Sequence, residues 1–439
     1  MALFDQSSLN PGVRGREVFG WAMYDFANSG YTTVVLTAVF NAYFVGAVAG
    51  NASWATLLWT ATLAASSLAV MLTAPAIGAY ADAHRAKKRL LLISTIACVA
   101  STAGLALVGP AMVALAVLLI VISNYFYAIG ETLIAAFLPE LSRPESLGKV
   151  SGWGWSFGYF GGMLALGLSL AWVIHAQGAG QPASSFVPVT MLITAVIYLL
   201  AASLTFAWLR ERGREPATAR SVGKGLGAAV RESFARLGQT WGHARSLTDM
   251  FWMLVCGCAY QAGIAVVIAL AAVYAEQVMN FEKKETMLLV FVVNIASALG
   301  AFGFGYIQDR IGHRRALALT LLGWIVMVLL AALGGSRPYF WAAAWLAGLC
   351  MGSSQSAGRA IVGLLAPSHR VAEFYGLWAF ATRLSAVIGP ITYGLVTWGT
   401  GGDHRTAILV TGLFFVAGLI TLARIDLDRG AAAARAYRD

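Results

Sequence analysis

The stretch GYIQDRIGHRR at residues 305–315 decides the fold, because it lies between two long apolar segments and has a second copy earlier in the chain. The earlier copy, GAYADAHRAKKR at residues 78–89, keeps a glycine that is followed four residues later by an aspartate. Three landmarks recur at offsets of 224 to 228 residues: Gly78 and Asp82 with Gly305 and Asp309, Pro139 with Pro367, and Gly152 with Gly376. The chain is therefore predicted to consist of two related halves.

The composition assigns these halves to a membrane. Of the 439 residues, 59% are hydrophobic and only 11% are charged, and the mean hydropathy is +0.72. Soluble chains average about 25% charged residues. A chain with this much apolar surface needs lipid as its solvent, which excludes a soluble enzyme or a soluble binding protein.

The apolar segments are long enough to cross a bilayer, which takes about 20 residues. Residues 1–19 are polar, and the first apolar run continues directly into a full span, so we expect an uncleaved first helix. One long polar segment, 210–248, divides the chain into an N-terminal bundle (1–209), a cytoplasmic linker and a C-terminal bundle (249–439). Twelve spans are predicted, at residues 20–46, 54–80, 89–108, 111–137, 150–174, 187–209, 249–275, 286–307, 315–334, 338–364, 371–398 and 405–424.

The positions of lysine and arginine predict the orientation. With both termini in the cytoplasm, the cytoplasmic segments hold 24 of these residues and the outer loops hold 4. Cytoplasmic loops of membrane proteins carry such an excess. We expect an inner (plasma) membrane protein whose net charge of +10 reflects topology and contact with anionic lipid, with no need for a nucleic-acid partner.

The stretch at 305–315 resembles the loop signature of the major facilitator superfamily: a glycine, an aspartate four residues on, Arg-x-Gly and a basic pair. The first copy departs from it, since Ala83 stands where a basic residue is usual and the second glycine is missing. This resemblance covers the whole chain. It implies an all-α fold of twelve transmembrane helices in two pseudo-symmetric six-helix bundles, a monomer without a cofactor, and transport by rocking of the halves.

The repeated glycines and aspartates have a physical role in such a fold. Glycine lets two helices approach closely, and a carboxylate is stabilised at the N-terminus of a neighbouring helix. The resemblance implies that Asp82 faces the start of span 11 and Asp309 the start of span 5, so that both hold the cytoplasmic side closed. The alternative is a positively charged loop with incidental acids.

A companion motif, PELSR at residues 139–143, follows span 4. Its acid and its arginine could exchange partners with Arg85, Lys87 or Asp309 as the halves move. An isolated loop ion pair contributes only about 0–1 kcal/mol, so only a network that differs between states would matter. The predicted gating residues are Gly78, Asp82, Arg85, Glu140, Arg143, Gly305, Asp309, Arg310 and Arg314.

Span 1 opens with WAMYDFANSGY at residues 21–31, which resembles the signature of the major facilitator branch that contains the fungal vacuolar amino-acid effluxers linked to autophagy. This resemblance implies amino acids as substrates. Asp25 and Asn28 lie on one face of the helix, and a carboxylate within a span normally has a function. The alternative is a structural acid near the end of span 1.

Four ionisable residues lie well inside the predicted spans: Asp25, Glu131, Arg359 and Arg383. Glu131 and Arg359 are 228 residues apart, the repeat offset, so they should occupy equivalent places in the two halves. In this superfamily spans 1, 4, 7 and 10 line the cavity. We hypothesise that Glu131 and Arg359 face each other across it as a gate or binding pair, with Gln355 on the same helix face as Arg359. A static structural pair is the alternative.

Arg383 lies about twelve residues into span 11, near the middle of the membrane. A guanidinium binds a carboxylate or phosphate with two hydrogen bonds, so Arg383 is the candidate for the solute's anionic group. Alternatively it neutralises Asp25 or Glu131. If transport is coupled to an ion, H⁺ and Na⁺ both remain open; a proton would be carried by Asp25 or Glu131, because every histidine maps to a loop.

These features predict a secondary transporter that moves a small polar solute, with amino acids favoured, by alternating access. A carrier for sugars, peptides, drugs or lipid-like molecules is the nearest alternative, and a membrane sensor that retains the fold is a second. No catalytic cluster or metal-ligand cluster is present in the sequence, so no enzyme activity is expected.

Overall fold

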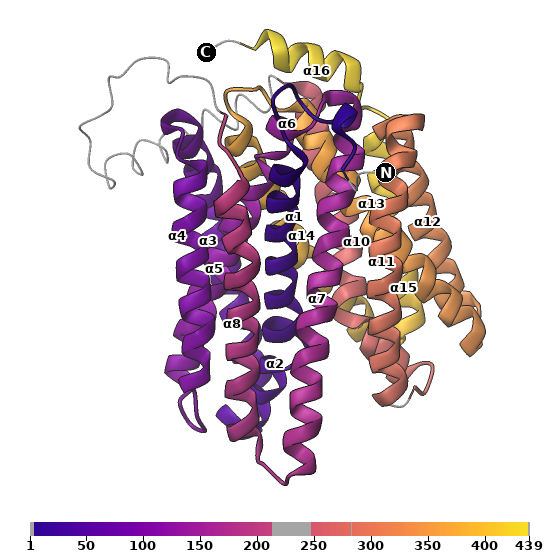
Figure 1. Cartoon of the computed structure of the whole chain (residues 1–439). Coiled ribbons are helices and arrows are strands. Elements are labelled where there is room, and N and C mark those ends of the chain that lie inside the picture. The colour runs from indigo at the N-terminus through magenta and orange to yellow at the C-terminus, as the bar shows by residue number, and fades with distance from the viewer. Residues whose placement is uncertain (1–3, 213–246, 282, 438–439) are drawn as a thin grey trace.

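The computed structural model describes residues 4–212, 247–281 and 283–437, and these are helical apart from turns and one isolated β-bridge. Long helices run side by side, those of the N-terminal half in indigo to magenta and those of the C-terminal half in orange to yellow (Figure 1). The N-terminal half comprises α1 (Gly15–Tyr31), α2 (Phe40–Tyr43), α3 (Ala55–His84), α4 (Lys87–Gly104), α5 (Val113–Ala135), α6 (Leu138–Leu141), α7 (Leu147–Gly178) and α8 (Ala183–Trp208). The C-terminal half comprises α10 (Thr248–Gln277), α11 (Lys283–Ile311), α12 (His313–Leu333), α13 (Arg337–Leu365), α14 (Val371–Gly399), α15 (His404–Leu422) and α16 (Leu427–Ala436).

Eleven helical segments in the described part of the chain are long and apolar enough to cross a membrane. The first, Gly15–Val48, continues α1 through two π-helical turns. The predicted tenth span coincides with α13, which has 29 residues but is less apolar because it contains the polar run GSSQSAGR at 352–359. The prediction of an all-α polytopic membrane protein is confirmed.

The first contact between the halves is the crossing of α3 and α14, where two glycines remove the side chains from between the backbones. A Cβ atom on Gly78 would overlap the carbonyl oxygen of Ala372. A Cβ atom on Gly376 would lie 2.6 Å from the Cα of Pro75. The two helices therefore touch backbone to backbone, which is the role that small residues have in membrane helix packing.

The second contact, between α7 and α11, repeats this arrangement at the equivalent positions. A Cβ atom on Gly152 would overlap the carbonyl oxygen of Ala301, and one on Gly305 would lie 2.9 Å from that of Gly148. The repeat seen in the sequence is thus a repeat of helix crossings between the halves.

Both crossings involve the ends of α3 and α11 and the beginnings of α7 and α14, so they lie toward one end of the molecule. In Figure 1 this end is at the top, where α6, α16 and the segment before α1 also lie. We call it the closed face, because here the two halves are held together.

The segment before α1 lies across the closed face and is bound mainly through backbone groups. The Asn10 side-chain amide donates to the carbonyl oxygens of Pro139 and Glu140 at 2.9 and 3.1 Å. Arg143 Nε donates to the Leu9 carbonyl oxygen at 2.9 Å. The companion motif at residues 139–143 therefore binds the N-terminal segment through these hydrogen bonds.

We predict that Gly152→Ala weakens the α7–α11 crossing, because the added methyl group would overlap the Ala301 carbonyl oxygen. Overpacking of this kind costs about 1–3 kcal/mol, which should lower the thermal unfolding temperature of the purified protein. Gly167→Ala is the matched control, since Gly167 is on the same helix and a Cβ there has no neighbour within 4 Å. Equal unfolding temperatures for the two variants would contradict the close packing described above.

Candidate functional site

Asp309, at the end of α11, binds the start of α7. Its Oδ1 accepts a hydrogen bond from the Gly148 backbone N–H at 3.1 Å, and its Oδ2 accepts one from that of Lys149 at 3.2 Å. These N–H groups belong to the first turn of α7. The N–H groups of a first turn have no acceptor within the helix, and they favour a negative charge nearby. The expected geometry is present, and its role in gating stays a prediction.

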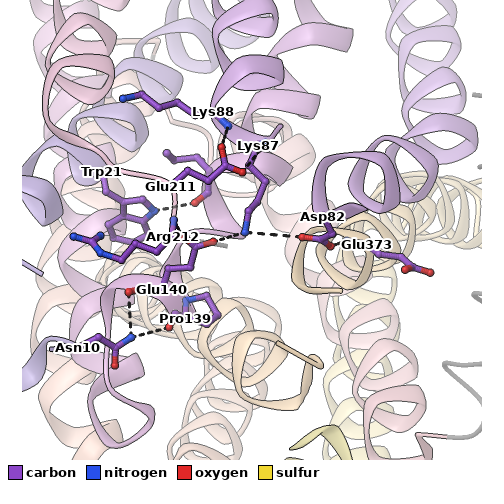
Figure 2. Close-up of polar contacts among 11 residues, drawn as sticks. Asn10, Trp21, Asp82, Lys87, Lys88, Pro139, Glu140, Glu211, Arg212 and Glu373 are labelled. Atoms are coloured by element: carbon purple, nitrogen blue, oxygen red, sulfur yellow. Dashed lines mark hydrogen bonds and ion pairs between the residues drawn. The ribbon is translucent and has the colours of Figure 1, made fainter. Parts of the chain in front are cut away.

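Asp82, at the end of α3, makes the equivalent contact with the start of α14. Its Oδ2 accepts from the Glu373 backbone N–H at 3.0 Å. Lys87 Nζ lies 3.9 Å from Asp82 Oδ1 and forms an ion pair with Glu140 (Figure 2). Lys87 thereby connects the companion motif to the carboxylate that binds the other half.

Glu140 also binds the chain just after α8. Its Oε2 accepts from the Arg212 backbone N–H at 2.8 Å, while the neighbouring Glu211 accepts from the N–H groups of Lys87 and Lys88 at 3.0 and 3.1 Å (Figure 2). The first residues of the predicted linker thus cap α4 and hold Glu140 at the closed face.

The remaining predicted gating residues have simpler environments. Arg143 was expected to exchange acidic partners, but in this structure its Nε binds a carbonyl oxygen of the N-terminal segment. Arg314 Nη2 donates to the Ala423 carbonyl oxygen at 2.9 Å. Arg85 ends α3 in the left-handed conformation (φ 50°), and its side chain is exposed, as is that of Arg310. Glu140 and Arg143 were expected to pair with Arg85, Lys87 or Asp309. Within the described residues, the contact found from this set is the ion pair of Glu140 with Lys87.

Arg359, from α13 of the C-terminal half, inserts into the N-terminal half beside Asp25 of α1. Its Nη1 donates to Asp25 Oδ2 at 2.7 Å. Its Nε donates to Ser151 Oγ at 3.1 Å and its Nη2 to the Ser151 carbonyl oxygen at 2.8 Å, both on α7. The side chains are only 8% and 11% exposed for Arg359 and Asp25. This is a buried, hydrogen-bonded ion pair between the halves.

Two tryptophans flank the Arg359 guanidinium. Its Cζ lies 4.7 Å from the ring centroid of Trp21 and 5.4 Å from that of Trp155. Indole rings attract a cation, most strongly in a desolvated site. A Cβ atom on Gly154 would overlap Asp25, which explains why a glycine lies between Trp153 and Trp155 of α7. Among the described residues, the groups that bind this guanidinium all belong to the N-terminal half.

The second ion pair between the halves joins Glu131 of α5 to Arg383 of α14. Arg383 Nη2 lies 3.5 Å from Glu131 Oε2, and the side chains are 21% and 40% exposed for Arg383 and Glu131. Both residues are well inside membrane-spanning helices. The pair joins the two halves, both side chains are partly exposed, and the longer separation makes the contact weak.

The hypothesis that Glu131 pairs with Arg359 is wrong for this structure. Arg359 pairs with Asp25, and Glu131 pairs with Arg383, the arrangement named as the alternative for Arg383. The repeat makes Glu131 and Arg359 equivalent in their own halves, but it does not determine which helix of the other half each one meets.

Two other predicted site residues have partners within their own half. Asn28 Oδ1 accepts from the Tyr198 hydroxyl at 2.6 Å, inside the N-terminal bundle, and the residue is 5% exposed. Gln355 Oε1 accepts from the Gln261 side-chain amide at 2.7 Å in the C-terminal half. A role for either in solute binding stays a prediction.

The family described as "Vacuole effluxer Atg22 like" matches residues 42–435. The chain belongs to this family. An "Uncharacterized MFS-type transporter YxiO" of Bacillus subtilis is 26% identical over 411 residues, which are 92% of this chain and 93% of the relative. This Atg22-like protein is accordingly an MFS-type transporter.

Fungal relatives match a smaller part. Autophagy-related protein 22-1 of Penicillium rubens is 28% identical over 302 residues, 64% of this chain and 50% of the fungal protein, so the chain spans about half the length of that relative. Among solved structures, the human organic anion transporter MFSD10 has a TM-score of 0.73 at 16% identity, covering 93% of this chain and 99% of that one. FucP in the outward conformation has a TM-score of 0.70 at 14% identity, with coverages of 93% and 96%. These likenesses show the major facilitator fold.

Sequence reasoning missed the groups of α7 that bind Arg359, namely Ser151 and Trp155. The signal that could have found them is the run SGWGW at 151–155, in which two large aromatic side chains alternate with glycine. Glycine there suits helix packing, but the tryptophans also provide a surface for a cation. Arg359 was identified inside another span, but nothing in the sequence connected it with this run.

We predict that Asp309→Asn shifts the equilibrium toward opening of the closed face, because it removes the charge that two helix N–H groups bind. A cap interaction contributes about 0.5–2 kcal/mol, so the open population should rise about 2- to 30-fold. Maleimide labelling of Ser356→Cys in a cysteine-free background measures this, since Ser356 is buried where α13 meets α7.

Asp403→Asn is the control for this experiment. Asp403 also accepts two backbone N–H bonds, from Arg405 at 2.9 Å and Thr406 at 3.2 Å, but both lie in its own half at the start of α15. The control should leave the labelling rate unchanged. An equal rate in Asp309→Asn and in the unsubstituted protein would refute the gating role of Asp309.

Proposed function

We propose that this protein is a secondary carrier that moves a small zwitterionic solute, foremost an amino acid, by alternating access. The observation that carries the proposal is the Glu131–Arg383 pair: one acid and one base from opposite halves, in contact within membrane-spanning helices and partly exposed. Charged groups within spans are costly and mark solute or ion pathways. The name of the fungal relatives' family, which describes effluxers, supports the same class of activity.

The weakness of this pair suits exchange with a solute. At 3.5 Å and partly exposed, it contributes little to stability. An amino acid offers an ammonium for Glu131 and a carboxylate for Arg383, which can bind it with two hydrogen bonds. Each side chain would then exchange one ionic partner for another, so neither charge would be left alone in the membrane. Because the two residues are in different halves, the bound solute would connect the halves.

The Asp25–Arg359 pair would control the closed face. Arg359 binds only N-terminal groups there, so opening requires it to leave Asp25, Ser151 and both tryptophans. Arginine remains charged under all physiological conditions, so Asp25 is the group whose protonation could release the pair. Coupling to H⁺ through Asp25 or Glu131 is part of the proposal, and Na⁺ is the competing coupling ion.

We further propose a cell inner membrane location with both termini in the cytoplasm, a monomeric state, and two bundles, 1–209 and 249–439, that move as units joined by residues 210–248. The excess of lysine and arginine at the closed face supports this orientation. Most of the linker, residues 213–246, lies outside the described residues.

The test is counterflow of labelled amino acids in proteoliposomes, with and without a pH gradient. We expect saturable counterflow of one amino-acid class, and we expect Arg383→Ala to reduce it at least tenfold, because the solute carboxylate loses a charged partner. Arg337→Ala is the matched control, since it breaks an exposed ion pair with Glu285 (2.8 Å) in the same half. The control should retain full flux.

Two outcomes would contradict the proposal. Absence of counterflow for every amino acid would exclude this solute class and direct the search to sugars, peptides and lipid-like molecules. Equal losses in Arg383→Ala and Arg337→Ala would show that the effect of the first substitution is structural, and the Glu131–Arg383 pair would no longer be the solute site.

A further inference from the structure

A pair of glutamines joins α10 to α13 within the C-terminal half. Gln261 Nε2 donates to Gln355 Oε1 at 2.7 Å. Gln261 is 7% exposed and Gln355 is partly exposed. These two glutamines take part in neither the Asp25–Arg359 nor the Glu131–Arg383 ion pair, so the roles of those pairs do not explain the glutamine pair.

Each amide retains an unused group. Within the described residues, the hydrogen bond between the two amides uses neither Gln261 Oε1 nor Gln355 Nε2, and neither atom is fully buried without a partner. The pair therefore offers one acceptor and one donor side by side. Reversing both amides would exchange the two roles and leave the same combination on offer.

The glutamine pair lies at the depth of the proposed solute site. The Tyr375 hydroxyl donates to the Arg359 carbonyl oxygen at 2.7 Å and lies next to Gly363, which aligns α13 with α14. Arg383 is eight residues beyond Tyr375, and Gln355 is eight residues before Gly363. At 1.5 Å per residue, both are displaced by about 12 Å in the same direction along the antiparallel helices.

The pseudo-symmetry of the halves relates Gln261 to Asp25. The Tyr24 hydroxyl lies against Gly130 in the N-terminal half, and the Tyr260 hydroxyl lies against Gly358 in the C-terminal half. Each tyrosine is followed directly by the residue in question, Asp25 or Gln261. One half thus has a charged side chain at this position where the other has a neutral amide.

We propose that Gln261 and Gln355 form a subsite for a neutral hydrogen-bonding group of the solute, an amide or a hydroxyl. A neutral amide pair cannot act as the negative countercharge of Arg359 or Arg383. Its free donor and acceptor do match those of a carboxamide or hydroxyl. The fully buried Tyr260 hydroxyl interacts with the Gln261 side chain that follows it in the sequence. The inference rests on the proposed function, in which Glu131 and Arg383 hold the charged groups.

The experiment compares solutes that differ only in the neutral group. The purified protein is titrated with glutamine against methionine, and with threonine against valine, while its thermal unfolding temperature is followed. In the unsubstituted protein we expect the amide or hydroxyl member of each pair to bind about 3- to 10-fold more tightly, the usual effect of one or two neutral hydrogen bonds. In Gln355→Met and Gln261→Met this ratio should fall to about 1, while the affinity for methionine and valine is unchanged.

Gln177→Met is the control, because Gln177 is an exposed glutamine near the end of α7. An unchanged ratio in both test variants would overturn the subsite. If no amino acid stabilises the unsubstituted protein, the proposed function fails, and a panel of sugars and polyols is titrated instead. Loss of a sugar's stabilising effect in the two test variants alone would then support the subsite with another solute, and no selective loss would overturn it.

Discussion

In this structure Arg359, a cation of the C-terminal half, joins the two halves, because the groups that bind it among the described residues all belong to the N-terminal half. Asp25 supplies the countercharge at 2.7 Å, Ser151 accepts two hydrogen bonds, and Trp21 lies over the guanidinium. Removing one member of such a buried pair costs about 3–5 kcal/mol, because the other charge is left without a partner. The halves must therefore stay in register wherever this pair forms, and the glycine crossings of α3 with α14 and of α7 with α11 provide that register.

The Asp25–Arg359 and Glu131–Arg383 pairs differ in burial and in length, which is the basis for proposing separate roles for them. The Asp25–Arg359 pair is short and nearly inaccessible, whereas the Glu131–Arg383 pair is longer and partly exposed. A buried pair whose guanidinium donates three hydrogen bonds holds a conformation. A partly exposed pair can exchange partners at small cost, as a site that must bind and release a solute requires. We infer that the carrier separates the control of opening from the binding of the solute.

The contacts that the sequence predicted well are those encoded within a few residues of a motif. Asp82 and Asp309 contact the helix beginnings that the family resemblance implied, because a carboxylate at a helix N-terminus needs only a glycine crossing and one turn of chain. The partners of Arg359 could not be predicted in the same way. They depend on how α1 and α7 pack beside α13. The offset of 228 residues shows that Glu131 and Arg359 occupy equivalent positions in their own halves, but it does not show that they are close in space. The N-terminal segment was missed as well, since Asn10 binds backbone carbonyls that leave no sequence pattern.

The most direct test of this account is the distance between spin labels on α3 and α16, at exposed positions Ala83 and Ala433 of the closed face, measured by pulsed electron paramagnetic resonance. The unsubstituted protein should show a dominant short distance. Arg359→Asp should transfer population to a longer distance, and adding Asp25→Arg should restore the short one, because the pair is re-formed with its charges exchanged. The account is contradicted if the distance distribution of Arg359→Asp equals that of the unsubstituted protein, since the halves would then be held together without this pair.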